Sequence, residues 1–291
     1  LAVIKDIWFL NEIDDRKDAA SALDPLPGNA KGIVISGGCD NVTVENIFGT
    51  TLGDTVEITT FSAVGEERCE STVRDILVRN VRSDCFIYSN VCVKNGDGGT
   101  AGGVVIDGVT DLSPVGSVYR AKAAVSVGET AFGFARAQLG ETRNFTVKNV
   151  TARGICAVEL VHSVQDITIA DITVKADGGA AIGCPSTLLY QNIYLCNVKF
   201  DHRNVMPYPI EKVRTSDYIE TPLFPGAHFY PYRAVCNMRD IHGFNFKING
   251  VYADMLDNLL RITGKNHIEL YDVDVENIVY DDFVGDDCVV D

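Results

Sequence analysis

Short stretches of alternating apolar and polar residues recur along the whole chain, and each ends in an Asn or Asp followed by another apolar residue. Clear copies are residues 41–47 (NVTVENI), 75–81 (DILVRNV), 144–150 (NFTVKNV) and 166–172 (DITIADI). The recurring Asn/Asp positions are 11, 46, 80, 149, 171, 197, 249 and 272. Their shortest intervals predict a repeating coil of about 22 to 26 residues, a period typical of solenoids.

A second family of short alternating strands lies between these copies. Its members are residues 32–35, 55–58, 124–127, 157–160, 180–183 and 259–262. Two strand types per coil, with almost no helical periodicity, predict an all-β, right-handed parallel β-helix of about 8 to 10 coils, forming a single domain over residues 1–291. A β-sandwich would also alternate, but it would not repeat one polar turn position so regularly.

The repeated Asn has a physical role in such a coil. Its side-chain amide can bond backbone groups nearby and the equivalent side chains above and below. Asn also tolerates the left-handed conformation that tight turns require. We therefore expect one Asn-rich turn at the same place in each coil.

Two regions depart from the coil pattern. Residues 201–233 form a long insertion rich in Pro and aromatic residues, in which Tyr230 and Tyr232 are candidates for stacking on sugar rings; a lid that only shields a sheet edge is the alternative. At the other end, residues 5–11 already match the coil pattern, so we expect that the N-terminal cap of the helix is absent from this chain.

The composition restricts the classes of partner that the chain can bind. With 25 Lys+Arg against 40 Asp+Glu, the formal charge is −15, which disfavours nucleic acid and anionic lipid surfaces. No apolar stretch is long enough for a membrane helix. The nine cysteines do not show zinc-binding spacing, so we predict no metal and no cofactor.

The N-terminal part resembles polygalacturonase-type glycoside hydrolases, within the pectate-lyase-like β-helix superfamily. The resemblance covers about residues 1–60 and rests on residues 29–35 (NAKGIVI), 39–46 (CDNVTVEN) and 53–58 (GDTVEI), which follow the order and spacing of the family's carboxylate-bearing segments. Lys31 stands where the family has its first carboxylate, Gly53 replaces one Asp of the family's pair, and Asp54 matches the other. This resemblance implies a β-helix that hydrolyses a polysaccharide.

Inverting hydrolysis needs two carboxylates, so Asp54 requires a partner. Asp84 lies on the next coil, where the spacing of adjacent strands is about 4.8 Å, and is one candidate. Strand alternation points Glu57 outward from its coil, and likewise Ser126, Glu159 and Arg261. The predicted catalytic residues are Asp54, Asp84 and Glu57, and the predicted substrate-binding residues are Lys31, Glu159, Arg261, Tyr230 and Tyr232.

Two functions follow from these observations. The first is a divergent glycoside hydrolase that acts on a polysaccharide or oligosaccharide outside the cell or at its surface. The second is a non-catalytic β-helix that binds a glycan or serves as a shaft, as in homotrimeric tail spikes or adhesins, which the replacement of two family carboxylates favours. The sequence does not name the sugar.

Overall fold

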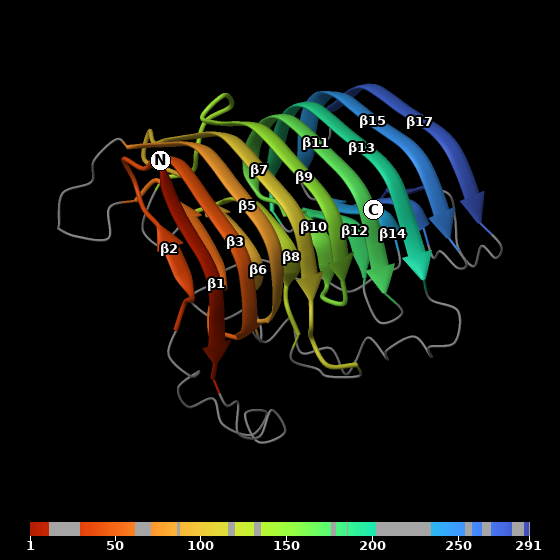
Figure 1. Ribbon diagram of the computed structural model, residues 1–291. Coiled ribbons are helices and arrows are strands. Elements are labelled where there is room, and N and C mark those ends of the chain that lie inside the picture. The colour runs from red at the N-terminus through yellow and green to blue at the C-terminus, as the bar shows by residue number, and fades with distance from the viewer. Residues whose placement is uncertain are drawn as a thin grey trace, which may run out of the picture.

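The chain is described by a computed structural model that covers residues 1–11, 30–61, 71–85, 88–115, 120–130, 135–175, 179–184, 186–201, 234–253, 258–263, 269–280 and 288–290. All of its regular elements in these ranges are β-strands, and they stack along one axis from the N-terminal to the C-terminal end (Figure 1). The chain is therefore an all-β parallel β-helix, as the repeat predicted.

Two parallel sheets form the walls of the β-helix, with nine strands each within the described residues. Sheet A contains β1 (Ala2–Leu10), β3 (Asp40–Thr50), β5 (Thr72–Asp84), β7 (Thr100–Asp111), β9 (Thr142–Ala152), β11 (His162–Lys175), β13 (Leu188–Asp201), β15 (Ile241–Ala253) and β17 (Glu269–Tyr280). Sheet B contains β2 (Ile33–Ile35), β4 (Val56–Thr59), β6 (Ser89–Lys94), β8 (Ala123–Glu129), β10 (Cys156–Leu160), β12 (Ala180–Cys184), β14 (Ala234–Arg239), β16 (Asn258–Thr263) and β18 (Cys288–Val290).

Each coil contributes one strand to each sheet, so every strand pairs with the strand two elements away in the chain. Equivalent positions of successive coils fall in rows that run along the helix axis. One inward row of sheet B passes through Val56, Val91, Val125 and Val158. All four are fully buried, and such rows form one continuous apolar core that each coil completes only against its neighbours.

The strands of sheet A turn at two left-handed positions, not one. Turn row 1 consists of Asn41, Asp75, Gly103, Asn144, Asp166, Asn192, Asn245 and Asp272. Turn row 2 consists of Asp6, Asn46, Asn80, Gly108, Asn149, Asp171, Asn197, Gly250 and Asn277. Every member has a positive φ, which is the conformation that Asn, Asp and Gly tolerate best.

The single predicted turn is correct at positions 46, 80, 149, 171 and 197 and wrong at three others. Asp6 takes the place predicted for Asn11, Gly250 that predicted for Asn249, and Asp272 belongs to turn row 1. The two rows are five residues apart and carry the same residue types. A sequence pattern that allows only one turn per strand therefore assigns some residues to the wrong turn row.

Side-chain amides link the members of turn row 2 from coil to coil. Asn80 Nδ2 donates to Asn46 Oδ1 at 2.7 Å, across 34 residues of sequence. Asn197 Nδ2 donates in the same sense to Asp171 Oδ1 at 2.5 Å, across 26 residues. This confirms the predicted amide ladder, in which the later coil donates and the earlier coil accepts.

The described residues contain no helix long and apolar enough to cross a bilayer. The predicted insertion lies almost entirely outside the described residues, since only its first residue, Asp201, is included.

Candidate functional site

The outward face of sheet B carries the candidate site. Strand alternation places Glu57, Cys92, Ser126 and Glu159 in a single outward row that continues through Asn237 to Arg261. The first four are buried although they point away from the apolar core. Buried polar groups need partners, and here lysines supply them.

Lys94, at the end of β6, joins the two carboxylates nearest the N-terminal end. Its Nζ lies 2.9 Å from Asp54 Oδ2 and 2.6 Å from Glu57 Oε2. The two carboxylate oxygens are thus separated by no more than the sum of these distances. Lys31 Nζ completes the contacts of Glu57 at 2.6 Å from the same Oε2 and 2.8 Å from Oε1. Ser89 N donates to Asp54 Oδ1 at 3.0 Å.

The two acids respond differently to this environment. Burial raises the pKa of Asp54 above its ordinary value, and the charge of Lys94 only partly opposes this. Burial also acts to raise the pKa of Glu57, but Lys94 and Lys31 together hold it below its ordinary value. Asp54 is therefore biased towards the protonated form and Glu57 towards the ionised form. Opposed pKa shifts in neighbouring carboxyl groups are typical of acid–base sites.

A second set of charges continues along the same face. Lys122 Nζ contacts Glu129 Oε2 and lies 3.4 Å from Glu159 Oε2. Ser126 Oγ donates to Glu159 Oε2 at 2.7 Å, and Cys92 Sγ donates to Glu129 Oε2 at 3.3 Å. These bonds satisfy buried carboxylates that strand alternation alone would leave without partners.

In this second set, Glu129 and Lys122 have the pKa shifts of a tight ion pair. Burial opposes ionisation of Glu129, yet Lys122 and Lys94 lower its pKa to about 2. Burial likewise opposes the charge on Lys122, while Glu129 and Glu159 raise its pKa well above the ordinary value. We call the seven charged residues the carboxylate–lysine cluster: Lys31, Asp54, Glu57, Lys94, Lys122, Glu129 and Glu159.

The structure brings some of the predicted site residues together and separates others. Asp54, Glu57, Lys31 and Glu159 all belong to the cluster. Asp84 ends β5 in sheet A, where it is the register neighbour of Thr50. Asp54 shares the ammonium of Lys94 with Glu57.

Arg261 continues the outward row four strands beyond Ser126, on β16, away from the carboxylates. Tyr230 and Tyr232 lie outside the described residues.

Sequence reasoning missed Lys94, Lys122 and Glu129. Residues 90–93 (NVCV) alternate like the other members of the second strand family, but β6 was not recognised as one of them. Extending this alternation by one residue would have directed Lys94 outward, like Glu57 on the neighbouring strand. Lys122 precedes β8, where no alternation predicts its direction.

Within the described ranges, no three His, Cys, Asp or Glu side chains are grouped so that they could hold a metal ion. The cysteines at positions 39, 85, 92, 156, 184, 196 and 236 are free thiols. Burial raises the pKa of Cys92 well above the ordinary thiol value, so it contributes to the site as a hydrogen-bond donor and not as a thiolate.

Comparison of the chain with protein-family models, with curated proteins and with solved structures gives no match.

Proposed function

We propose that this chain is a glycoside hydrolase that acts on a polysaccharide, with Asp54 as the general acid and Glu57 as the second carboxylate. The observation that carries the proposal is the pair itself: two carboxyl groups that share one ammonium group and have pKa values shifted in opposite directions. Glycosidases need one protonated and one ionised carboxyl group at the same bond.

The short separation of the two groups favours a retaining mechanism. Carboxyl groups roughly 5 to 5.5 Å apart leave no room for a water between the sugar and the second carboxylate, whereas inverting enzymes need roughly 6.5 to 9.5 Å. Asp54 would protonate the glycosidic oxygen while Glu57 attacks the anomeric carbon. Water would then hydrolyse the glycosyl ester, with Asp54 accepting the proton of that water.

Access to the pair depends on Lys94. Asp54 is 1 % exposed and Glu57 3 % exposed, and the ammonium of Lys94 contacts both. A sugar can reach the two acids only if this ammonium moves aside, and its stem of four methylene groups allows such movement.

The test is the release of reducing ends from a panel of soluble neutral and acidic polysaccharides. The wild type should cleave at least one of them, and Asp54→Asn and Glu57→Gln should each abolish that cleavage. Glu45→Gln is a matched control, because Glu45 pairs with Arg79 on sheet A, far from the cluster in the fold. Cleavage that survives in Asp54→Asn would remove this residue from the mechanism.

A non-catalytic role is the second candidate. Its support is that lysines pair with all four carboxylates of the cluster, so these buried charges are compensated without a bound substrate. In this case the wild type would cleave none of the polysaccharides. A stable homotrimer, measured by light scattering after gel filtration, would then favour a shaft of the tail-spike or adhesin type.

A further inference from the structure

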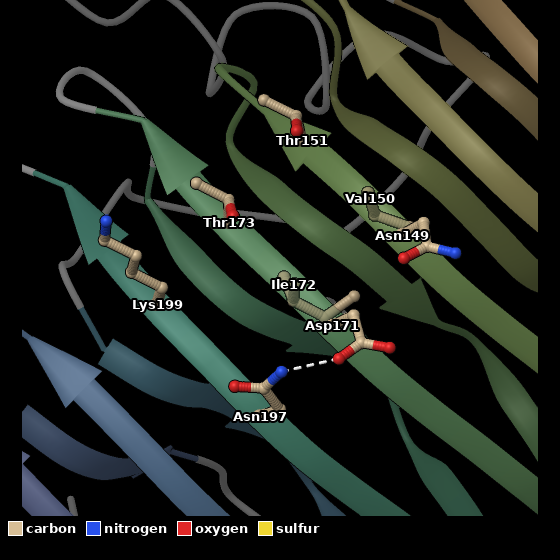
Figure 2. Close-up of a pocket in the computed structure, with 8 residues that line it drawn as sticks. All are labelled: Asn149, Val150, Thr151, Asp171, Ile172, Thr173, Asn197 and Lys199. Atoms are coloured by element: carbon tan, nitrogen blue, oxygen red, sulfur yellow. Dashed lines mark hydrogen bonds between the residues drawn. The ribbon is translucent and has the colours of Figure 1, made fainter.

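The outward face of sheet A has a shallow depression of about 350 Å³ over β9, β11 and β13. Figure 2 shows that its side chains come from equivalent positions of three successive coils. The polar ones are Asn149, Thr151, Asp171, Thr173, Asn197 and Lys199. They offer amide, hydroxyl, carboxylate and ammonium groups on a surface that lies on the other sheet from the carboxylate–lysine cluster.

The amide ladder of turn row 2 is interrupted inside this depression. Asn149 Nδ2 donates to Asp107 Oδ1 at 2.6 Å on the preceding coil, which leaves Asn149 Oδ1 as the group directed towards the next coil. The next coil presents Asp171, whose ionised carboxylate has no proton to donate. Asp171 Oδ1 accepts from Asn197, so Asn149 Oδ1 and Asp171 Oδ2 are two neighbouring acceptors without a donor from the described side chains (Figure 2).

Turn row 1 on the same strand shows how the fold satisfies an Asp when nothing else binds there. Asp166 Oδ1 accepts from Asn192 Nδ2 at 2.6 Å, as expected for the ladder. Its second oxygen accepts from Gln165 Nε2 at 3.0 Å. The residue equivalent to Gln165 in turn row 2 is Ala170, which cannot donate through its side chain. Asp171 Oδ2 therefore lacks the side-chain donor that Gln165 gives to Asp166.

Two further features suit a sugar chain. Lys199 supplies an exposed ammonium, and Tyr252 is its register neighbour on β15, 50 % exposed. The ring of Tyr252 turns back over the chain at Gly250, with Cε2 3.8 Å from the point that a Cβ there would occupy. It thus provides an apolar face beside polar groups, an arrangement on which the C–H face of a sugar can stack.

We infer that this depression is a second glycan-binding site, specific for a neutral polysaccharide whose hydroxyl groups donate to Asn149 Oδ1 and Asp171 Oδ2. The charge favours a neutral ligand, because the depression holds one carboxylate and one ammonium while the whole chain carries −15. The inference goes beyond the proposed hydrolysis and does not depend on it. Binding here would hold a long polymer against the β-helix without cleaving it.

The test is electrophoresis of the full chain in native gels that contain soluble neutral β-glucan, galactan or arabinoxylan, with polygalacturonate as the charged comparison. At least one neutral polymer should retard the wild type, and polygalacturonate should not. Tyr252→Ala should weaken that retardation. Failure of all three neutral polymers, or retardation by polygalacturonate alone, overturns the inference.

Two substitutions remove the free acceptors without a loss of packing. Asp171→Asn introduces an amide that can donate to Asn149 Oδ1, and Ala170→Gln supplies the donor that Gln165 gives to Asp166. Each should weaken binding about tenfold, the effect of one hydrogen bond to a charged group. Thr110→Val is the matched control, since Thr110 is the register neighbour of Thr151 but lies outside the depression. Unchanged affinity in both variants, or an equal loss in the control, would contradict the inference; the release of reducing ends, measured separately, reports on the proposed hydrolysis.

Discussion

The outward faces of the two sheets provide partners for their polar side chains in different ways. Each presents polar side chains in rows along the axis, because strand alternation directs every second residue away from the core. On sheet B the acids of the carboxylate–lysine cluster are buried, and they bond to lysines of the same coil or of a neighbouring one. On sheet A the polar side chains are largely exposed, and amides of the two turn rows bond from coil to coil. Burial therefore decides whether a row needs matched charges or only local hydrogen bonds.

Removal of Lys94 should produce the largest difference in stability between substitutions on the two faces. Lys94→Met leaves Asp54 and Glu57 buried without their shared ammonium. We expect a loss of about 3 to 5 kcal/mol in the free energy of unfolding, the usual effect of breaking a buried ion pair. Urea unfolding at neutral pH measures it.

The control for this prediction is Lys148→Met on sheet A. Lys148 Nζ lies 3.2 Å from Asp107 Oδ2, and both side chains are more than one third exposed. Removal of such a pair should cost less than about 1 kcal/mol. Similar losses in the two variants would show that the cluster on sheet B is not protected from water.

Acid should weaken sheet B through Glu129. Its pKa in the folded chain is about 2, below the ordinary value of 4.5, so its ionised form stabilises the fold at neutral pH. That contribution, roughly 3 kcal/mol, is complete above about pH 5 and is lost as the pH falls towards 2. Asp54 acts in the opposite direction, because its raised pKa favours the fold at low pH.

The measurement is the free energy of unfolding from urea titrations at pH 7, 4 and 3. At pH 7 the wild type should have a larger free energy of unfolding than Glu129→Gln, and this difference should shrink as the pH falls. A difference that stays constant down to pH 3 would mean that Glu129 is not held ionised by Lys122 and Lys94.

The contrast between the faces also explains what the sequence could predict. The coil, the two strand families and the outward direction of Glu57 and Glu159 follow from alternation, which is a local property. The contact between Asp54 and Lys94 spans 40 residues of sequence. The number of residues between equivalent strand positions differs from coil to coil, so no fixed interval in the sequence relates a carboxylate to its lysine.

The sequence alone also fails to identify both turn rows, although they lie only five residues apart. The residue types for a left-handed turn are visible at Asn41 and Asn46 alike, but only the paired strands show that both positions turn. Asp171 and Asp166 look equivalent in the sequence. Their difference depends on whether a neighbouring side chain can donate, which requires the register of three coils.

Restoring the ladder at Asp171 should stabilise sheet A. In Asp171→Asn the new amide can donate to Asn149 Oδ1 while its oxygen still accepts from Asn197. We expect a gain of about 1 kcal/mol in the free energy of unfolding, the net value of one hydrogen bond. Asp166→Asn should change little, because the gain is offset by a weaker bond from Gln165. Equal gains in the two variants would remove the distinction between the turn rows.

The smallest effect is expected where turn row 2 contains glycine. Gly108 has a φ of 83°, and a Cβ there would come no closer than 3.4 Å to Asn80 N, so a side chain fits. Gly108→Asn should add up to about 0.5 kcal/mol, because the gain from an amide that donates to Asn80 Oδ1 exceeds the cost of the left-handed conformation for Asn. Gly108→Ala should instead lose about 1 kcal/mol, since it takes the same conformation without an amide. The difference between the two midpoints of urea unfolding measures what the Asn side chain contributes, through its tolerance of the left-handed conformation and its hydrogen bond together. Identical midpoints would show that the ladder on this exposed face adds no stability.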